Sequence, residues 1–141
     1  MTVLNVSGPG PELKNQLGTV PVAQAAGTVN GTGVDRLGFN FAVLEAQTGA
    51  ITGAPSAQTL DCKLQHSDAS GSGYTDVTGG AVAQITAANS RKRKTIDLRG
   101  LKRYVRVVTV AAFTGGTTPT IANVCTLQLA GADTLPAQSD D

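Results

Sequence analysis

Short runs in which apolar and polar side chains alternate are the feature that most constrains the fold of this chain. Leu60, Cys62 and Leu64 alternate with Asp61 and Lys63, which is the two-residue period of a strand with one buried face and one solvent face. The same pattern predicts further strands at residues 37–44, 74–77, 82–85, 95–98, 104–113 and 121–129. About seven or eight short strands separated by turns are typical of a β-sandwich or jelly roll. We therefore expect an all-β fold.

The composition agrees with one such domain that works in an assembly. The chain has 141 residues, which suits a single domain, and its 17 glycines favour turns over helices. Only 15% of the residues are charged, against roughly 25% in most soluble domains. A surface with so little charge is suited to being covered by partners.

We expect three parts along the chain: an extended N-terminal arm over residues 1–30, a single β-sandwich (jelly-roll-like) domain over residues 31–136, and an acidic flexible tail over residues 137–141. The arm is predicted because residues 8–11 alternate Gly and Pro, which excludes regular structure. An arm of this kind is either disordered or laid across a partner.

Two of the predicted strands should supply much of the core. Residues 37–44 hold two of the three Phe, and the alternation predicts one buried face made of Leu37, Phe39, Phe41 and Val43. Residues 104–113 form the most strand-like run and should be a central strand. Its two faces are predicted to carry Val105, Val107 and Phe113 on one side and Val108 and Val110 on the other.

We find no arrangement of residues suited to catalysis, and we expect neither an enzyme nor a metal or cofactor site. His66 is the only histidine, and it stands at a strand end without a nucleophile motif, which predicts a structural role. Cys62 and Cys125 occupy apolar positions of predicted strands, so we expect buried free thiols in a reducing compartment. No apolar run is long enough to span a bilayer and no signal-peptide pattern begins the chain, which predicts synthesis in a cytoplasm without membrane attachment.

Positive charge is concentrated in one stretch, although the formal net charge is only +1. Eight of the 11 Lys and Arg lie between Arg91 and Arg106, and the stretch begins with a basic run at residues 91–94. We expect this basic run to form a loop, because adjacent cations repel and are best satisfied by water or an anionic partner. Docking on an acidic protein patch and a simple solvated loop are both open interpretations. Direct nucleic-acid binding is disfavoured, because stacking aromatic residues and an overall positive charge are missing. The candidate partner-contact residues are Arg91, Lys92, Arg93, Lys94, Arg99 and Lys102.

Several stretches carry a resemblance to a known family: residues 60–68 (LDCKLQHSD), 74–77 (YTDV), 96–107 (IDLRGLKRYVRV) and 131–136 (GADTLP). In these stretches, and over about residues 59–136, the chain resembles the capsid cement (decoration) proteins of tailed phages, such as that of a Bordetella phage. The resemblance implies a β-sandwich or jelly roll that coats the exterior of an HK97-type capsid. It also implies that the protein clamps neighbouring major capsid proteins, forms a homo-oligomer (a dimer or trimer, with the dimer favoured) and has no catalysis.

Two other functions stay open. Residues 101–107 look like the penultimate strand of discoidin-type jelly rolls that bind carbohydrate. Such modules present exposed Trp or Tyr rings, and this chain has no Trp and only Tyr74 and Tyr104. The other alternative is a different virion part, such as a tail-tube or head–tail joining subunit.

Overall fold

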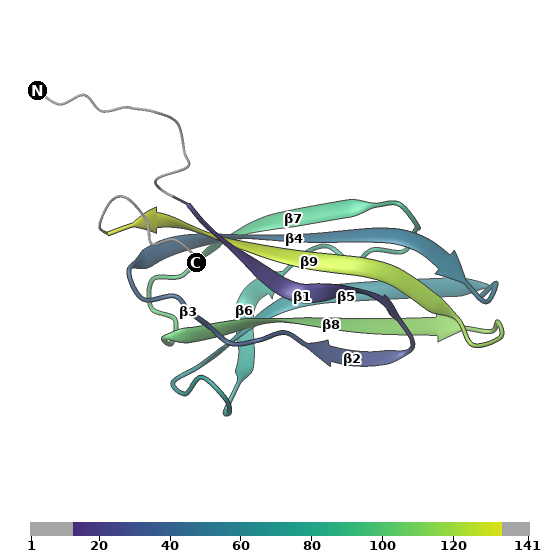
Figure 1. The fold of residues 1–141 in the computed structure, drawn as a ribbon, viewed down its shortest axis with the longest axis horizontal. Helices are drawn as coiled ribbons and strands as arrows, with labels where there is room; N and C mark the ends of the chain where they lie inside the picture. Colours follow the sequence, from purple (N-terminus) through teal and green to yellow (C-terminus); the bar gives the residue numbers. More distant parts are fainter. Residues whose placement is uncertain (1–12, 134–141) are drawn as a thin grey trace, which may run out of the picture.

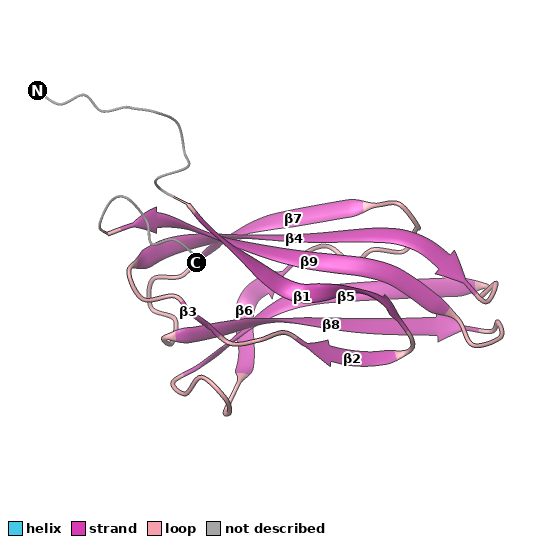
Figure 2. Cartoon of the chain, in the orientation of Figure 1, coloured by secondary structure: helices cyan, strands magenta, loops and turns pink. Residues whose placement is uncertain are grey.

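The computed structural model describes residues 13–133, which form two β-sheets packed face to face. Figure 1 shows the sheets as two layers that run along the long axis of the molecule. Residues 13–133 contain strands and loops and no helix (Figure 2). The all-β expectation is therefore confirmed.

The strands fall into a four-stranded and a five-stranded sheet. In spatial order, the first sheet contains β1 (Lys14–Gln24), β9 (Thr120–Ala132), β4 (Phe39–Thr52) and β7 (Arg91–Asp97). The second sheet contains β2 (Gly27–Asn30), β8 (Tyr104–Thr114), β5 (Ala57–Ser67) and β6 (Thr75–Ala81), with the short β3 (Val34–Asp35) also paired to β8. All pairings are antiparallel, and β1 and β7 are the two edges of the first sheet.

The strand order is that of a jelly roll, because the chain behaves as one long hairpin wrapped into two layers. β5 pairs with β6 across the turn at residues 68–74, and then β4 pairs with β7, β2 with β8 and β1 with β9. These successive pairs alternate between the second and the first sheet. The β4–β9 and β5–β8 ladders join the pairs into the two layers. This arrangement confirms the predicted jelly-roll sandwich.

The core lies between the layers and is built from the positions that the alternation predicts on three strands. The fully buried positions on β5 and β9 are Leu60, Cys62, Leu64, Ile121, Cys125, Leu127 and Leu129. On β8, Val105 and Val107 are buried in the core and Phe113 packs against it. The predicted inner face of β8 is thus confirmed.

The predicted phase of β4 is right for Phe39 and wrong for the rest of the strand. The buried side chains of this strand are Phe39, Ala42, Leu44 and Ala46. By contrast, Leu37, which precedes the strand, is 65% exposed and Phe41 is 37% exposed. The pairing with β9 sets Leu44 opposite Leu127, and residues directly opposite in a sheet share a face. The inward face is therefore the one that Leu44 occupies.

Residues 14–30 belong to the sandwich, so the expectation of an arm over residues 1–30 is wrong for this part. β1 pairs with β9, and β2 pairs with β8. β1 also touches the residue that follows β2: a Cβ added to Gly31 would lie 1.9 Å from the carbonyl oxygen of Gly18, so the two backbones are in contact. Residues 1–12 of the predicted arm and the predicted tail at residues 137–141 lie outside the described residues.

A buried polar cluster fastens β1 to β8 and β9. Gln24 is 3% exposed, and its Oε1 accepts hydrogen bonds from the Thr109 hydroxyl (3.0 Å) and from Asn123 Nδ2 (3.1 Å). Its Nε2 donates to the Gly27 carbonyl (3.0 Å). Buried polar groups are costly unless they are hydrogen-bonded, so this cluster fixes where β1 lies.

The strand predicted at residues 82–85 does not form as a separate element. Val82 N–H donates to the Cys62 carbonyl and Ile85 N–H to the Leu60 carbonyl (both 3.0 Å), and both side chains are buried. The segment therefore runs beside β5 and continues the edge that β6 begins.

Candidate interaction surface

The basic run, residues 91–94, lies in β7, which corrects its prediction as a loop. β7 is paired with β4 along its length, from Arg91 opposite Gln47 to Asp97 opposite Phe41. Adjacent cations are compatible with a strand here because a strand sends neighbouring side chains to opposite faces. Residues 91–95 are all exposed, so each charge remains in water.

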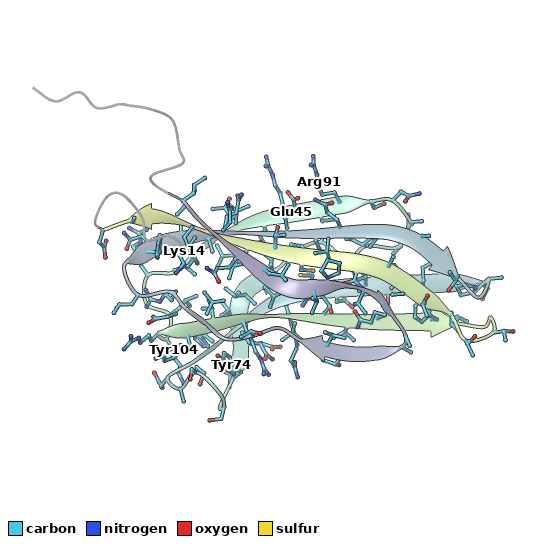
Figure 3. The ribbon with its side chains drawn as sticks, viewed as in Figure 1. Lys14, Glu45, Tyr74, Arg91 and Tyr104 are labelled. Carbon is cyan, nitrogen blue, oxygen red and sulfur yellow. The ribbon has the colours of Figure 1, made fainter. Side chains whose placement is uncertain are left out.

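Two cations of the basic run lie on the outer face of the first sheet. Arg91 and Arg93 are opposite Gln47 and Glu45, and directly opposite residues share a face. Figure 3 shows Arg91 and Glu45 projecting from the same side, away from the second sheet. The outer face at this edge therefore carries two guanidinium groups.

The other two cations lie on the inner side of the sheet. Lys92 and Lys94 are opposite the buried Ala46 and Leu44. They are nevertheless exposed, whereas Ile96 further along the same side is buried. Because β7 is the last strand of the sheet, both lysines reach solvent at the rim of the sandwich.

The charge of the basic run is not compensated within the described part of the chain. None of the four cations forms an ion pair with a carboxylate of residues 13–133. Glu45 lies opposite Arg93 in the register, but its Oε1 accepts a hydrogen bond from Gln47 Nε2 (2.6 Å). The result is a stripe of positive charge along a sheet edge.

The structure does not bring Arg99 and Lys102 together with the basic run. Arg99 follows β7 and binds Asp97 through Nε and Nη2 (3.0 and 2.9 Å), and its guanidinium lies over the Phe41 ring. The hydrogen bonds from Arg99 lower the pKa of Asp97 to about 2. Lys102 pairs with Asp68 (3.3 Å). Both of these cations are compensated, unlike those of the basic run.

The opposite edge of the first sheet is apolar, a feature that the sequence analysis missed. β1 exposes Leu17 (52%), Val20 (64%) and Val22 (41%), and shallow grooves between β1 and β9 lie beside Leu17 and Val22. The sequence does indicate this apolar surface, because residues 15–24 carry no charge. The alternation there is broken, since register shifts interrupt the β1–β9 ladder between Leu17 and Val22.

The two tyrosines lie on the side of the second sheet (Figure 3), and a guanidinium covers each ring. Arg106 lies over Tyr74, with 4.3 Å to the ring centroid, and Arg103 lies over Tyr104, with 5.3 Å. Arg106 also donates a hydrogen bond from Nε to Gln65 Oε1 (2.9 Å). Neither ring is therefore an open stacking platform.

The remaining candidates for chemistry have structural surroundings. His66 Nδ1 accepts a hydrogen bond from the Lys102 backbone N–H (3.3 Å). Cys62 and Cys125 are buried and free, as predicted, and a hydrogen bond to Cys125 together with burial raises the pKa of the Cys62 thiol. Within residues 13–133, no group of three or more His, Cys, Asp or Glu could hold a metal ion. That part of the chain also has no helix able to cross a membrane.

Comparison with known proteins finds distant structural similarity only. No family model and no curated protein matches the chain. A protein derived from the SPBc2 prophage, YomS, is 14% identical, with 90% of this chain and 100% of that chain covered and a TM-score of 0.48. A Bacillus endospore appendage pilus protein is also 14% identical, with 93% of this chain and 99% of that chain covered and a TM-score of 0.44. A Desmodium yellow mottle tymovirus chain is 11% identical, with 100% of this chain and 97% of that chain covered and a TM-score of 0.39. Similarity this distant carries no argument about function, which therefore has to be inferred from the residues.

Proposed function

We propose that this protein is a capsid cement protein, a structural virion component that binds the exterior of an HK97-type phage capsid. In this role it is made in the host cytoplasm and attaches to major capsid proteins. It clamps neighbouring capsid subunits and so stabilises the head. It performs no reaction and binds neither nucleic acid nor membrane.

The observation that carries the proposal is the uncompensated basic run on β7. Four exposed cations on a strand that is paired with β4, without a carboxylate partner in residues 13–133, form a docking surface for an acidic protein patch. Low charge elsewhere reduces the desolvation cost of covering a wide surface. Attachment at many sites of a repeating lattice turns modest affinities into firm binding. The resemblance of residues 59–136 to phage cement proteins supports a capsid as that lattice.

A binding assay with purified shells that lack this protein tests the proposal. Replacing all four residues of the basic run with Ser should weaken co-sedimentation with the shells, and the binding of the parent protein should weaken as salt rises. Arg99→Ser with Lys102→Ser is the matched control, because these cations are already paired with Asp97 and Asp68. Shells that keep the same heat tolerance with and without the protein would contradict a cement function.

We further propose that the protein is a dimer built on the apolar edge at β1. In a two-fold interface each patch meets its own copy, so an apolar patch is self-complementary. The basic run cannot serve in this way, because cations would face cations. The exposed Leu17, Val20 and Val22 therefore mark the self-association surface, and β7 remains free for the capsid.

The alternative functions have less support. A carbohydrate-binding module needs open aromatic rings, whereas Arg106 and Arg103 cover Tyr74 and Tyr104. A tail-tube or head–tail joining subunit would occur in rings of few copies. The copy number per particle therefore separates these parts from a cement protein, which covers the whole shell.

A further inference from the structure

The free edge of β7 carries unpaired main-chain groups in a defined order. In an antiparallel pair, residues that exchange hydrogen bonds with the opposite strand alternate with residues whose N–H and C=O point away. Just before β7, the Ser90 carbonyl accepts a hydrogen bond from the Thr48 N–H of β4 (2.8 Å). Just after β7, the Leu98 N–H donates to the Asn40 carbonyl of β4 (2.9 Å). The even-numbered residues therefore bond to β4, and the N–H and C=O of Arg91, Arg93 and Thr95 point outward. No strand of residues 13–133 pairs with that side.

We propose that this edge binds an extended acidic segment of its partner by main-chain pairing, so that the partner adds a strand to the first sheet beyond β7. The inference rests on the proposed function and specifies how the basic run recognises the capsid. A peptide backbone supplies donors and acceptors for the outward groups of Arg91, Arg93 and Thr95. Carboxylates at successive positions of the added strand, which lies about 4.8 Å away, meet arginines on the outer face and lysines on the inner side.

Two other occupants fit this edge less well. A second copy of β7 would place cations directly against cations, which destabilises a strand pair. A nucleic acid would neutralise the charge, but its phosphates accept hydrogen bonds and donate none, so the outward carbonyls of Arg91, Arg93 and Thr95 would stay unpaired. Only an acidic peptide strand satisfies both the charges and the main-chain groups.

A peptide titration tests this binding mode without the capsid. The probe is a capped seven-residue peptide with Glu at successive central positions and Thr at its ends. Its control is the same peptide N-methylated at every residue, which keeps the charge but removes the main-chain donors of both strand edges. A short oligothymidylate serves as the non-peptide polyanion. We expect the unmodified peptide to shift the NMR amide signals of Arg91, Arg93 and Thr95 at low salt. N-methylation should weaken binding about tenfold or more, because several hydrogen bonds are lost.

A proline variant tests the same mode on the shells. Thr95→Pro removes one outward N–H and keeps all four cations, and it leaves the hydrogen bonds between β7 and β4 intact, since Pro is tolerated on edge strands. Thr95→Val, which keeps the N–H, is the matched control. We expect Thr95→Pro to weaken shell attachment at least about fivefold and Thr95→Val to leave it unchanged.

The outcomes separate the binding mode from the proposed function. Equal binding of the N-methylated peptide, or equal binding of the oligothymidylate, would overturn strand addition. Full attachment of Thr95→Pro together with lost attachment of the four-Ser variant would also overturn strand addition. In that case the charge of the basic run alone would support the cement function. If neither variant loses attachment, β7 is not the capsid contact and both proposals fail at this surface.

Discussion

Gln24 offers the sharpest test of how β1 is held in the sandwich. In Gln24→Leu the side chain keeps its bulk but loses its hydrogen bonds. The Thr109 hydroxyl, which is fully buried, loses its acceptor at a cost of about 1–3 kcal/mol. Asn123 Nδ2 keeps its bond to the Ile121 carbonyl (3.2 Å) and loses the other, for roughly 1 kcal/mol more. We therefore expect a loss of about 2–4 kcal/mol in the free energy of unfolding.

Urea unfolding followed by far-UV circular dichroism measures this loss as a lower midpoint at an unchanged slope. In the double variant Gln24→Leu with Thr109→Val no orphaned hydroxyl remains, so it should be more stable than the sum of the single changes by about 1–2 kcal/mol. Gln84→Leu is the control, because Gln84 is exposed and bonds to Asp61 on the surface, and it should change stability by less than about 0.5 kcal/mol. A Gln24→Leu midpoint equal to that of the parent would show that the cluster does not hold β1.

Two further predictions concern the same side of the molecule. In Gly31→Ala the added Cβ meets the Gly18 carbonyl oxygen at 1.9 Å, so we expect thermal unfolding to show that the free energy of unfolding falls by roughly 1–3 kcal/mol or more. Gly71→Ala is the control, because its Cβ meets nothing within 4 Å, and it should be nearly neutral. Equal stability of the two variants would refute the close contact. Val20→Glu should convert the proposed dimer to a monomer in analytical ultracentrifugation, because two carboxylates would meet at a two-fold interface, whereas Thr28→Glu on the exposed β2 should remain dimeric; a Val20→Glu dimer would remove β1 as the interface.

The fold could be predicted where one strand face is apolar and the other is polar. β5 is such a strand: Leu60, Cys62 and Leu64 are buried between polar neighbours, and the alternation alone identified the inner face. β4 is different, because both of its alternating sets contain apolar residues. Its inner face is decided by the β9 residues opposite, such as Leu127 opposite Leu44, and no local pattern contains that information.

Strands that depend on distant partners could not be predicted locally. β1 is uncharged but interrupted by register shifts, and it exists because it pairs with β9, about a hundred residues further along the chain. The first part of β7, residues 91–94, was predicted as a loop because its four cations repel one another, whereas a strand was expected only from residue 95 on. Pairing with β4 offsets this repulsion, since the strand period separates neighbouring charges onto two faces.

The candidate site was predictable in composition and only partly in arrangement. The charge density of residues 91–94 is visible in the sequence, and Asp97, two residues before Arg99, is a local hint that Arg99 is paired. The pairing of Lys102 with Asp68 joins segments that are distant in the sequence. Only the fold therefore shows which cations are free to meet a partner.

The sign of the charge on β7 distinguishes a docking edge from an edge that is merely protected. Native sheets often place charged side chains on an edge strand to prevent pairing with other copies. Lys is a common protective residue on edge strands, but protection alone does not require an unbroken run of four cations at Arg91, Lys92, Arg93 and Lys94. The four consecutive cations disfavour pairing with another copy of β7 by repulsion and at the same time attract an acidic strand. The same residues thus disfavour self-pairing and favour an acidic partner. For this reason we propose β7 as the capsid contact and β1 as the self-association surface.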